Sequence, residues 1–237
     1  FNYPLQYSDL KIMKDYDKIS EELSSRKEKT PSVENFEKYW LDAIGPTLYN
    51  KFVNSYSAKM WGINTNKELE ANFEWVNRGT PIRSGDTRLY GDKFQGYPES
   101  LDGYNKYFLK SLEDVDVVYK CYVEGFDYKN RIVKTSKGDF TADIIINTIH
   151  VDTLFNYEYG PLRYFGREFI PFILPVEYAM PKDCTWVHYS GKERFTRITE
   201  FKKITGYESD FTLLGLELPS KKGRFYPVQS KPELMRL

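Results

Sequence analysis

Aromatic rings and a hydroxyl side chain gather at the end of one amphipathic segment. Phe52 and Tyr56 are four residues apart, so a helix would place both rings on one face. Ser57 follows Tyr56, and Trp61 stands next to Gly62, a residue typical of a helix C-terminus. Flat rings of this kind can stack on a nucleotide base. The segment therefore has the residue types of a base-binding surface.

Arginines recur in the loop-like stretch that follows, at Arg78, Arg83 and Arg88, among glycine and proline residues. A planar guanidinium group can hold phosphate oxygens through two parallel hydrogen bonds. Rings followed by arginines together predict a site for a nucleotide diphosphate. Spacing alone leaves an alternative open, in which the rings fill the core and the arginines lie on the surface.

Composition excludes several other classes. The chain has 34 basic and 34 acidic residues, which argues against nucleic acid as the main partner. Two cysteines, Cys121 and Cys184, are too few for a disulfide framework, so a cytoplasmic location is expected. His150 and His188 belong to no zinc-like cluster. Prolines interrupt the longest apolar run, at 169–176, so no membrane span is expected.

The first hundred residues read as a mainly helical substrate-binding unit, 1–100. A charged and polar stretch at about 17–33 predicts a helix end that runs into a mobile linker. Asn35 or Ser32 is expected to cap the next helix. The helices expected after this cap span 36–60 and 69–76.

Residues 101–237 read as a β-rich unit. A helix is expected at 102–112, and a hairpin is expected to turn at Lys129-Asn130. The sequence therefore predicts an α+β protein: a small helical unit plus a mixed, largely antiparallel sheet layer. The strands expected are 115–119, 121–126, 131–135, 142–147, 163–169, 185–189, 197–200 and 212–218.

Several sequence pieces occur in an order that resembles the UDP-galactopyranose mutase family. Each piece is a weak signal, whereas their order and spacing from Asn35 to Val228 are fairly specific. The β-rich half also resembles the central part of flavoprotein oxidase-like folds. The pieces are 35–45, 48–49, 52–62, 78–83, 92–98, 102–104, 155–160, 195–202 and 225–228.

The resemblance implies a chemistry. Enzymes of this family interconvert UDP-galactopyranose and UDP-galactofuranose through a sugar–flavin adduct formed on reduced FAD, and they serve cell-surface polysaccharide biosynthesis. The partner implied is a UDP-sugar, with UDP-galactose the first choice, and a homodimer is an open expectation. The full-length protein would be an isomerase.

The resemblance also implies residue roles. Phe52 and Tyr56 would flank the uracil, while Ser57 and Trp61 would approach ribose, phosphate or sugar. Arg78 would close on the diphosphate from a mobile loop. Two further roles follow: Tyr226 would bond a phosphate oxygen, and Thr148 with His150 would lie on the wall that faces the flavin.

The chain departs from the family pattern at several positions. An aromatic–arginine pair is expected where Tyr164 and Phe165 stand, and Arg163 or Arg167 is expected to compensate. Losing one guanidinium could remove about 1.5–3 kcal/mol of charge-assisted bonding. The other departures are Val53 for a phenylalanine, Leu89 for a tyrosine, and Ile149-His150 for Gly-Pro.

A dinucleotide-binding flavoprotein needs a glycine-rich turn, and the pattern G-x-G-x-x-G occurs nowhere in the sequence. We therefore expect a portion of a flavoenzyme that does not retain FAD tightly and is inactive alone. Two alternatives stay open. One is a non-catalytic nucleotide-sugar-binding relative, and the other is an amine-oxidase-like flavoprotein with a different substrate.

Overall fold

The computed structural model describes residues 1–26, 31, 34–71, 82–85, 96–98, 102–230, 232 and 235. The chain forms two compact units. The first joins Phe1–Tyr97 to Tyr164–Lys231, and the second joins Pro98–Arg163 to Pro232–Leu237. These units differ from the division near residue 100 expected from the sequence, because the strands after residue 163 pack with the N-terminal helices. A functional division at residue 100 remains a prediction.

The helices of the first unit enclose an apolar core that includes Ile19 and Leu48, both with no exposed surface. The predicted linker is wrong over residues 17–24, because Ile19 anchors a packed helix there. Residues 27–30 and 32–33 lie outside the described residues. The helices are α1 (Tyr7–Leu10), α2 (Tyr16–Ser24), α3 (Phe36–Leu48), the π-helix η1 (Tyr49–Val53), α4 (Asn54–Trp61) and the 3-10 turn η2 (Asn66–Glu68).

Local signals set the bounds of the long helical segment. The Asn35 side chain accepts a hydrogen bond from the Lys38 backbone N–H at 2.9 Å, so this predicted cap is confirmed. The alternative cap, Ser32, lies outside the described residues. Gly62 ends α4 with φ +59°, and a Cβ there would lie 2.3 Å from the Phe165 ring. Both its conformation and this close approach require glycine.

A second helix was predicted at 69–76, and the described part of this range, residues 69–71, is not helical. Leu69 forms an isolated β-bridge with Ser230, and residues 72–76 lie outside the described residues. A short parallel pair also closes this unit, β1 (Leu5–Gln6) with β2 (Ile82–Arg83).

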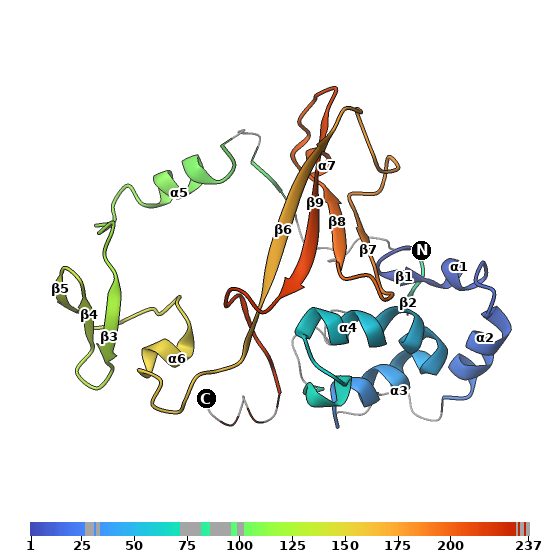
Figure 1. The fold of residues 1–237 in the computed structure, drawn as a ribbon, viewed down its shortest axis with the longest axis horizontal. Helices are drawn as coiled ribbons and strands as arrows, with labels where there is room; N and C mark the ends of the chain where they lie inside the picture. Colours follow the sequence, from blue (N-terminus) through green and yellow to red (C-terminus); the bar gives the residue numbers. More distant parts are fainter. Residues whose placement is uncertain are drawn as a thin grey trace. The chain divides into compact units, whose positions relative to one another are not determined.

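A five-stranded antiparallel sheet completes the first unit, in the order β10-β6-β9-β8-β7. Figure 1 shows its strands β6, β9, β8 and β7 side by side. The strands β6 and β9 form its long central pair, joined from Gly166↔Ser220 to Leu174↔Thr212. The late strands predicted from the sequence are confirmed. The elements are β6 (Tyr164–Leu174), β7 (Trp186–His188), β8 (Arg197–Glu200), α7 (Lys202–Thr205), β9 (Thr212–Ser220) and β10 (Tyr226–Pro227).

The second unit contains α5 (Asn105–Ser111), a three-stranded antiparallel sheet and α6 (Val151–Leu154). The predicted helix and the predicted hairpin at Lys129-Asn130 are confirmed. The Asn156 side chain bonds the Phe126 backbone N–H and carbonyl, which ties the segment after α6 to the sheet. The strands are β3 (Val123–Asp127), β4 (Ile132–Thr135) and β5 (Gly138–Thr141).

Two predicted strands in this unit, 115–119 and 142–147, are wrong. Both segments lack strand structure, and the side chains of Ile144 and Ile146 are 79% and 85% exposed. Apolar composition favours a strand only where a neighbouring strand accepts its hydrogen bonds, and the described residues of this unit offer none beside these segments. The predicted α+β class is nevertheless confirmed.

Candidate functional site

Helix α4 brings three of the predicted binding residues next to the sheet (Figure 1). Ser57 and Trp61 are buried, and Tyr56 is partly buried. The Trp61 ring meets the Tyr226 ring edge-on, with centroids 6.2 Å apart. Lys59 anchors the helix to the β7–β8 loop through the Gly191 carbonyl at 3.1 Å. The structure thus places Tyr56, Trp61 and Tyr226 in one region.

A row of polar side chains crosses the sheet beside this helix. His188 on β7 is paired with Arg197 on β8, and Arg197 is paired with Glu217 on β9. Residues directly opposite on neighbouring strands share a face and lie within side-chain reach. Arg197 Nη2 donates to Glu217 Oε2 at 2.5 Å. The Tyr56 hydroxyl lies 3.1 Å from His188 Nδ1, which joins the helix to the row.

Arg167 on β6 completes the cluster from the other side of β9. Its Nε donates to Glu217 Oε1 at 3.2 Å, and its Nη1 donates to the Gly166 carbonyl at 2.8 Å. The guanidinium carbon lies 5.2 Å from the Tyr226 ring centroid, a cation–π distance. Glu217 therefore bridges two arginines, and the trio carries one net positive charge.

Two donor nitrogens of this trio have no hydrogen-bond partner among the described residues. They are Arg167 Nη2 and Arg197 Nε, and both atoms are buried. The Arg167 side chain as a whole is only 3% exposed. Buried donors are normally satisfied, because a buried donor without a partner costs about 1–3 kcal/mol of stability, and more if the group is charged. An anion with several oxygens could satisfy both nitrogens.

Burial governs the protonation of the cluster. It raises the pKa of Tyr56 above its usual range, so this phenol keeps its hydrogen. Burial, with Arg197 adding to it, lowers the pKa of His188 to about 4, so the imidazole is neutral at pH 7. Burial also lowers the pKa of Arg167, and the Glu217 carboxylate opposes that shift. The positive charge near Tyr226 thus belongs to the arginines.

Phe52 lies elsewhere than its spacing predicts. The π-helix η1 winds this part of the chain more widely than an α-helix, so the four-residue α-helical spacing from Phe52 to Tyr56 does not apply. The Phe52 ring meets Phe1 edge-on at 5.7 Å, and it packs against the helical core. Tyr56 instead meets His188, at 5.6 Å between ring centroids. No ring contact joins Phe52 to Tyr56 in the described part of the chain.

The other predicted site residues lie apart from this cluster or beyond description. Arg163 is exposed and belongs to the second compact unit. Thr148 is exposed in the same unit, and His150 is the N-cap of α6, where its carbonyl accepts from Thr153 at 3.1 Å. Arg78 and Leu89 lie outside the described residues.

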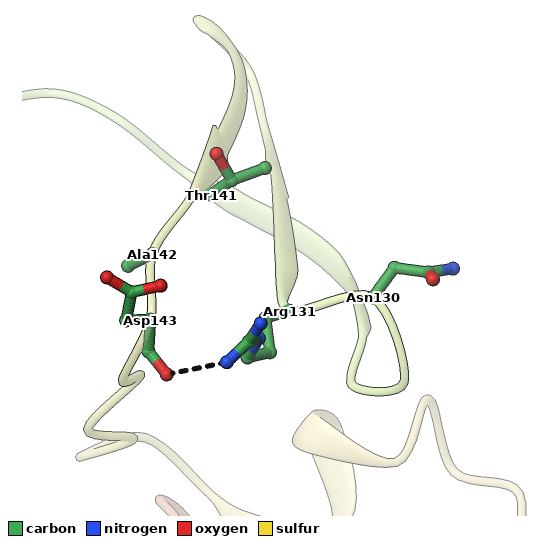
Figure 2. Close-up of a pocket in the computed structure, with 5 residues that line it drawn as sticks. All are labelled: Asn130, Arg131, Thr141, Ala142 and Asp143. Atoms are coloured by element: carbon green, nitrogen blue, oxygen red, sulfur yellow. Dashed lines mark hydrogen bonds between the residues drawn. The ribbon is translucent and has the colours of Figure 1, made fainter.

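The hollow drawn in Figure 2 lies in the second unit and has a volume of about 410 Å³. Arg131 Nη1 donates to the Asp143 carbonyl across this hollow at 3.2 Å. No aromatic ring and none of the predicted site residues lines it, so we do not regard it as a nucleotide site. The lining residues are Asn130, Arg131, Thr141, Ala142 and Asp143.

Three members of the cluster were not among the predicted site residues: His188, Arg197 and Glu217. Their strands were predicted, but side-chain contact between strands depends on sheet order and register, which local patterns do not give. One signal was present for Arg197, which stands inside the family-like piece 195–202. The cluster combines the Tyr56, Trp61 and Tyr226 rings with two guanidinium groups, of which Arg167 is buried and Arg197 is partly exposed. Rings and guanidinium groups are residue types that can contact the base and the phosphate oxygens of a nucleotide.

Comparison with known proteins agrees with the fold and with the sequence resemblance. The sequence profile of the UDP-galactopyranose mutase family matches residues 51–236, and the chain belongs to this family. A probable UDP-galactopyranose mutase of Klebsiella pneumoniae is 27% identical over 178 residues, which cover 74% of this chain and 42% of that protein. A dTDP-fucopyranose mutase of Escherichia coli is 28% identical over 180 residues, which cover 74% of this chain and 44% of that protein.

A solved structure shares the fold. A crystal structure of reduced UDP-galactopyranose mutase matches with a TM-score of 0.66 and 18% identity, over 88% of this chain and 52% of that chain. The chain thus spans about half the length of the relatives it matches.

Within the part of the chain that the structure describes, no helix is long and apolar enough to cross a membrane. Among the same residues, no three histidine, cysteine or carboxylate side chains are grouped to hold a metal ion. Both cysteines are free thiols.

Proposed function

We propose that the first unit binds the nucleoside diphosphate part of a UDP-sugar and presents the sugar for mutase chemistry. The observation that carries this proposal is the Arg167–Glu217–Arg197 trio with its two buried, unpartnered nitrogens. Two adjacent phosphate groups offer enough oxygens to accept from both guanidinium groups. UDP-galactose, interconverted between its pyranose and furanose forms, is the substrate we propose.

Charge supports the diphosphate as ligand. The trio supplies one net positive charge, because Glu217 neutralises one guanidinium. A nucleotide-sugar diphosphate carries two negative charges, so the site calls for one more cation. Arg78, which the family resemblance assigns to a closing loop, would supply it. Such closure excludes water and strengthens every charge interaction inside the site.

The replacement of an expected arginine by Phe165 is compensated within the same strand. Residues two apart in a strand share a face, so Phe165 and Arg167 lie on the same side of β6. Phe165 is buried against Gly62 at the end of α4, and Arg167 reaches the Tyr226 ring instead. We propose that Arg167, two residues after Phe165 on the same face of β6, supplies the missing positive charge to the diphosphate. Arg163, exposed in the other unit, is the weaker candidate.

The rings would hold the rest of the nucleotide. Tyr56 is the base-stacking residue we propose, with Phe52 at the edge of the base and Ser57 and Trp61 near ribose or phosphate. The Tyr226 hydroxyl, on a half-exposed side chain, would donate to a phosphate oxygen. The names of the two relatives specify UDP and dTDP, whose bases both carry two ring carbonyl groups.

The mutase family is FAD-dependent, and FAD is the cofactor we propose for the complete enzyme. Thr148, which is exposed, and His150, the N-cap of α6, are the residues we propose for the wall that faces the flavin. Among the described residues, no glycine-rich turn offers its backbone to a pyrophosphate, so FAD binding would depend on other parts of the complete enzyme. We place the reaction in the cytoplasm, where both thiols would stay reduced, and a homodimer stays a prediction.

A UDP titration followed by tryptophan fluorescence tests the proposal, since Trp61 is buried beside Tyr226. We expect saturable binding that Arg167→Leu weakens roughly tenfold to a hundredfold, because a charge-assisted bond is lost. Tyr56→Ala should weaken binding by a comparable factor through lost stacking. Arg194→Leu, at an exposed arginine of the same unit, is the matched control and should bind as the wild type does. Equal affinity in all variants would rule out this site.

A further inference from the structure

His188 lies between two tyrosine rings. Its Nδ1 is 3.1 Å from the Tyr56 hydroxyl, and the two rings meet edge-on with centroids 5.6 Å apart. The Tyr3 ring lies 4.9 Å from the imidazole at an interplanar angle of 53°. From sequence, this histidine reads as an ordinary hydrogen-bonded residue. Its contact with the proposed base-stacking tyrosine gives it a place in the site.

The direction of the Tyr56–His188 hydrogen bond follows from the two groups. The imidazole is neutral at pH 7, so it carries one ring N–H and one nitrogen lone pair. An imidazole nitrogen is a far better acceptor than a phenolic oxygen, and Tyr56 retains its hydrogen. Tyr56 therefore donates to Nδ1, and Nε2 carries the ring hydrogen.

This second nitrogen has nothing to bond in the described part of the protein. The side-chain hydrogen bond of His188 there is the one between Nδ1 and the Tyr56 hydroxyl, its ring neighbours are Tyr56 and Tyr3, and its strand neighbour is Arg197. We propose that His188 reads the base of the bound nucleotide, with Nε2–H donating to a ring carbonyl oxygen of a uracil-type base. This assignment rests on the proposed function and makes His188 a specificity-determining residue.

A base carbonyl suits this donor better than a phosphate does. The imidazole is neutral, whereas the charged donors belong to Arg167 and Arg197 on other strands. Uracil and thymine each carry two ring carbonyl oxygens, and adenine carries none. A site built to hydrogen-bond a ligand group rejects an analogue that lacks it, because the donor then loses its partner in the complex.

The test compares UDP, ADP and inorganic pyrophosphate on the wild type, His188→Phe and His188→Gln. Phenylalanine keeps a ring but has no donor, and the glutamine amide places an N–H near the position of Nε2. We expect His188→Phe to bind UDP roughly fivefold to tenfold more weakly, with pyrophosphate and ADP affinities unchanged. His188→Gln should bind UDP within about threefold of the wild type.

Each outcome decides the assignment. Equal UDP affinity in the wild type and His188→Phe overturns it and leaves the proposed diphosphate site intact. A parallel loss of UDP and pyrophosphate would mean that His188 only supports the fold of the site, and it also overturns the assignment. No UDP binding by the wild type would overturn the proposed function and this inference together. If His188→Phe does not fold, a loss of UDP binding of tenfold or more in His188→Gln decides against the assignment.

Discussion

Two buried carboxylates on neighbouring strands of one sheet, Glu200 and Glu217, have opposite surroundings. Glu200 has no exposed surface, and its oxygens accept from the backbone N–H groups of Ala179 and Met180 at 2.8 and 3.0 Å. The Thr212 hydroxyl also donates to it at 2.7 Å. This network fixes the loop after β6 to the sheet.

The cations beside the two carboxylates show the same contrast. Lys203 lies 3.5 Å from Glu200, and its ammonium group donates hydrogen bonds to backbone carbonyls that include those of Met180 and Cys184. The arginines beside Glu217 each keep one buried nitrogen without a partner among the described residues. A fully satisfied buried charge network rigidifies the fold, whereas an unsatisfied buried polar group in a native structure calls for an explanation such as a bound ligand or water. Under the proposed function, the Glu200 network serves the fold and the Arg167–Glu217–Arg197 trio faces the ligand.

The largest effect should come from breaking the satisfied network. Glu200→Gln replaces one carboxylate oxygen by an amide that cannot accept, and it leaves Lys203 as an uncompensated buried charge. We expect a loss of about 3–5 kcal/mol in the free energy of unfolding, measured by urea denaturation. A loss below about 1 kcal/mol would mean that this network is not what holds the loop.

A smaller effect follows from pH. His188 has a pKa of about 4 in the folded protein against 6.5 in the unfolded chain, so the unfolded state binds more protons between these values. Stability should therefore fall as the pH is lowered from about 6.5 to 4, by roughly 2 kcal/mol between pH 7 and 5. The charged group facing the imidazole is Arg197, which opposes its protonation.

The control for this pH dependence is His188→Gln, in which the titrating group is gone. Urea unfolding at pH 7 and pH 5 should show this part of the pH dependence in the wild type and not in the variant. The same slope in both proteins would assign it to other groups.

Parts of the fold could be predicted from the sequence where a single residue determines the local structure. The Asn35 cap, the Gly62 helix end and the Lys129-Asn130 turn each depend on one residue's own bonding or backbone preference. The strands from residue 163 onward alternate or carry β-branched residues, and they were found. Tyr56 and Trp61 were predicted as site residues from their spacing and from the family-like residues around them, and this role stays a prediction.

The sequence did not predict the side-chain contacts between residues far apart in the chain. The contacts of His188, Arg197 and Glu217 depend on the order β9-β8-β7 and on its register, and neither leaves a local signal. The charged stretch 17–33 was predicted to be a helix end that runs into a linker, because the apolar residues Ile19 and Leu23 are surrounded by polar ones. The helix extends through Ser24. The π-helix at η1, which separates Phe52 from Tyr56, also has no simple residue signature.

The most direct test of the central contrast is the free energy of unfolding of the wild type and Arg167→Leu, each with and without saturating UDP. Without UDP we expect the variant to lie within about 1 kcal/mol of the wild type, because Glu217 keeps Arg197. UDP at about a hundredfold its dissociation constant should stabilise the wild type by roughly 2.7 kcal/mol, and the variant much less at the same concentration. A variant that is strongly destabilised without ligand, yet stabilised equally by UDP, would show that Arg167 serves the fold as Glu200 does, and would contradict the account.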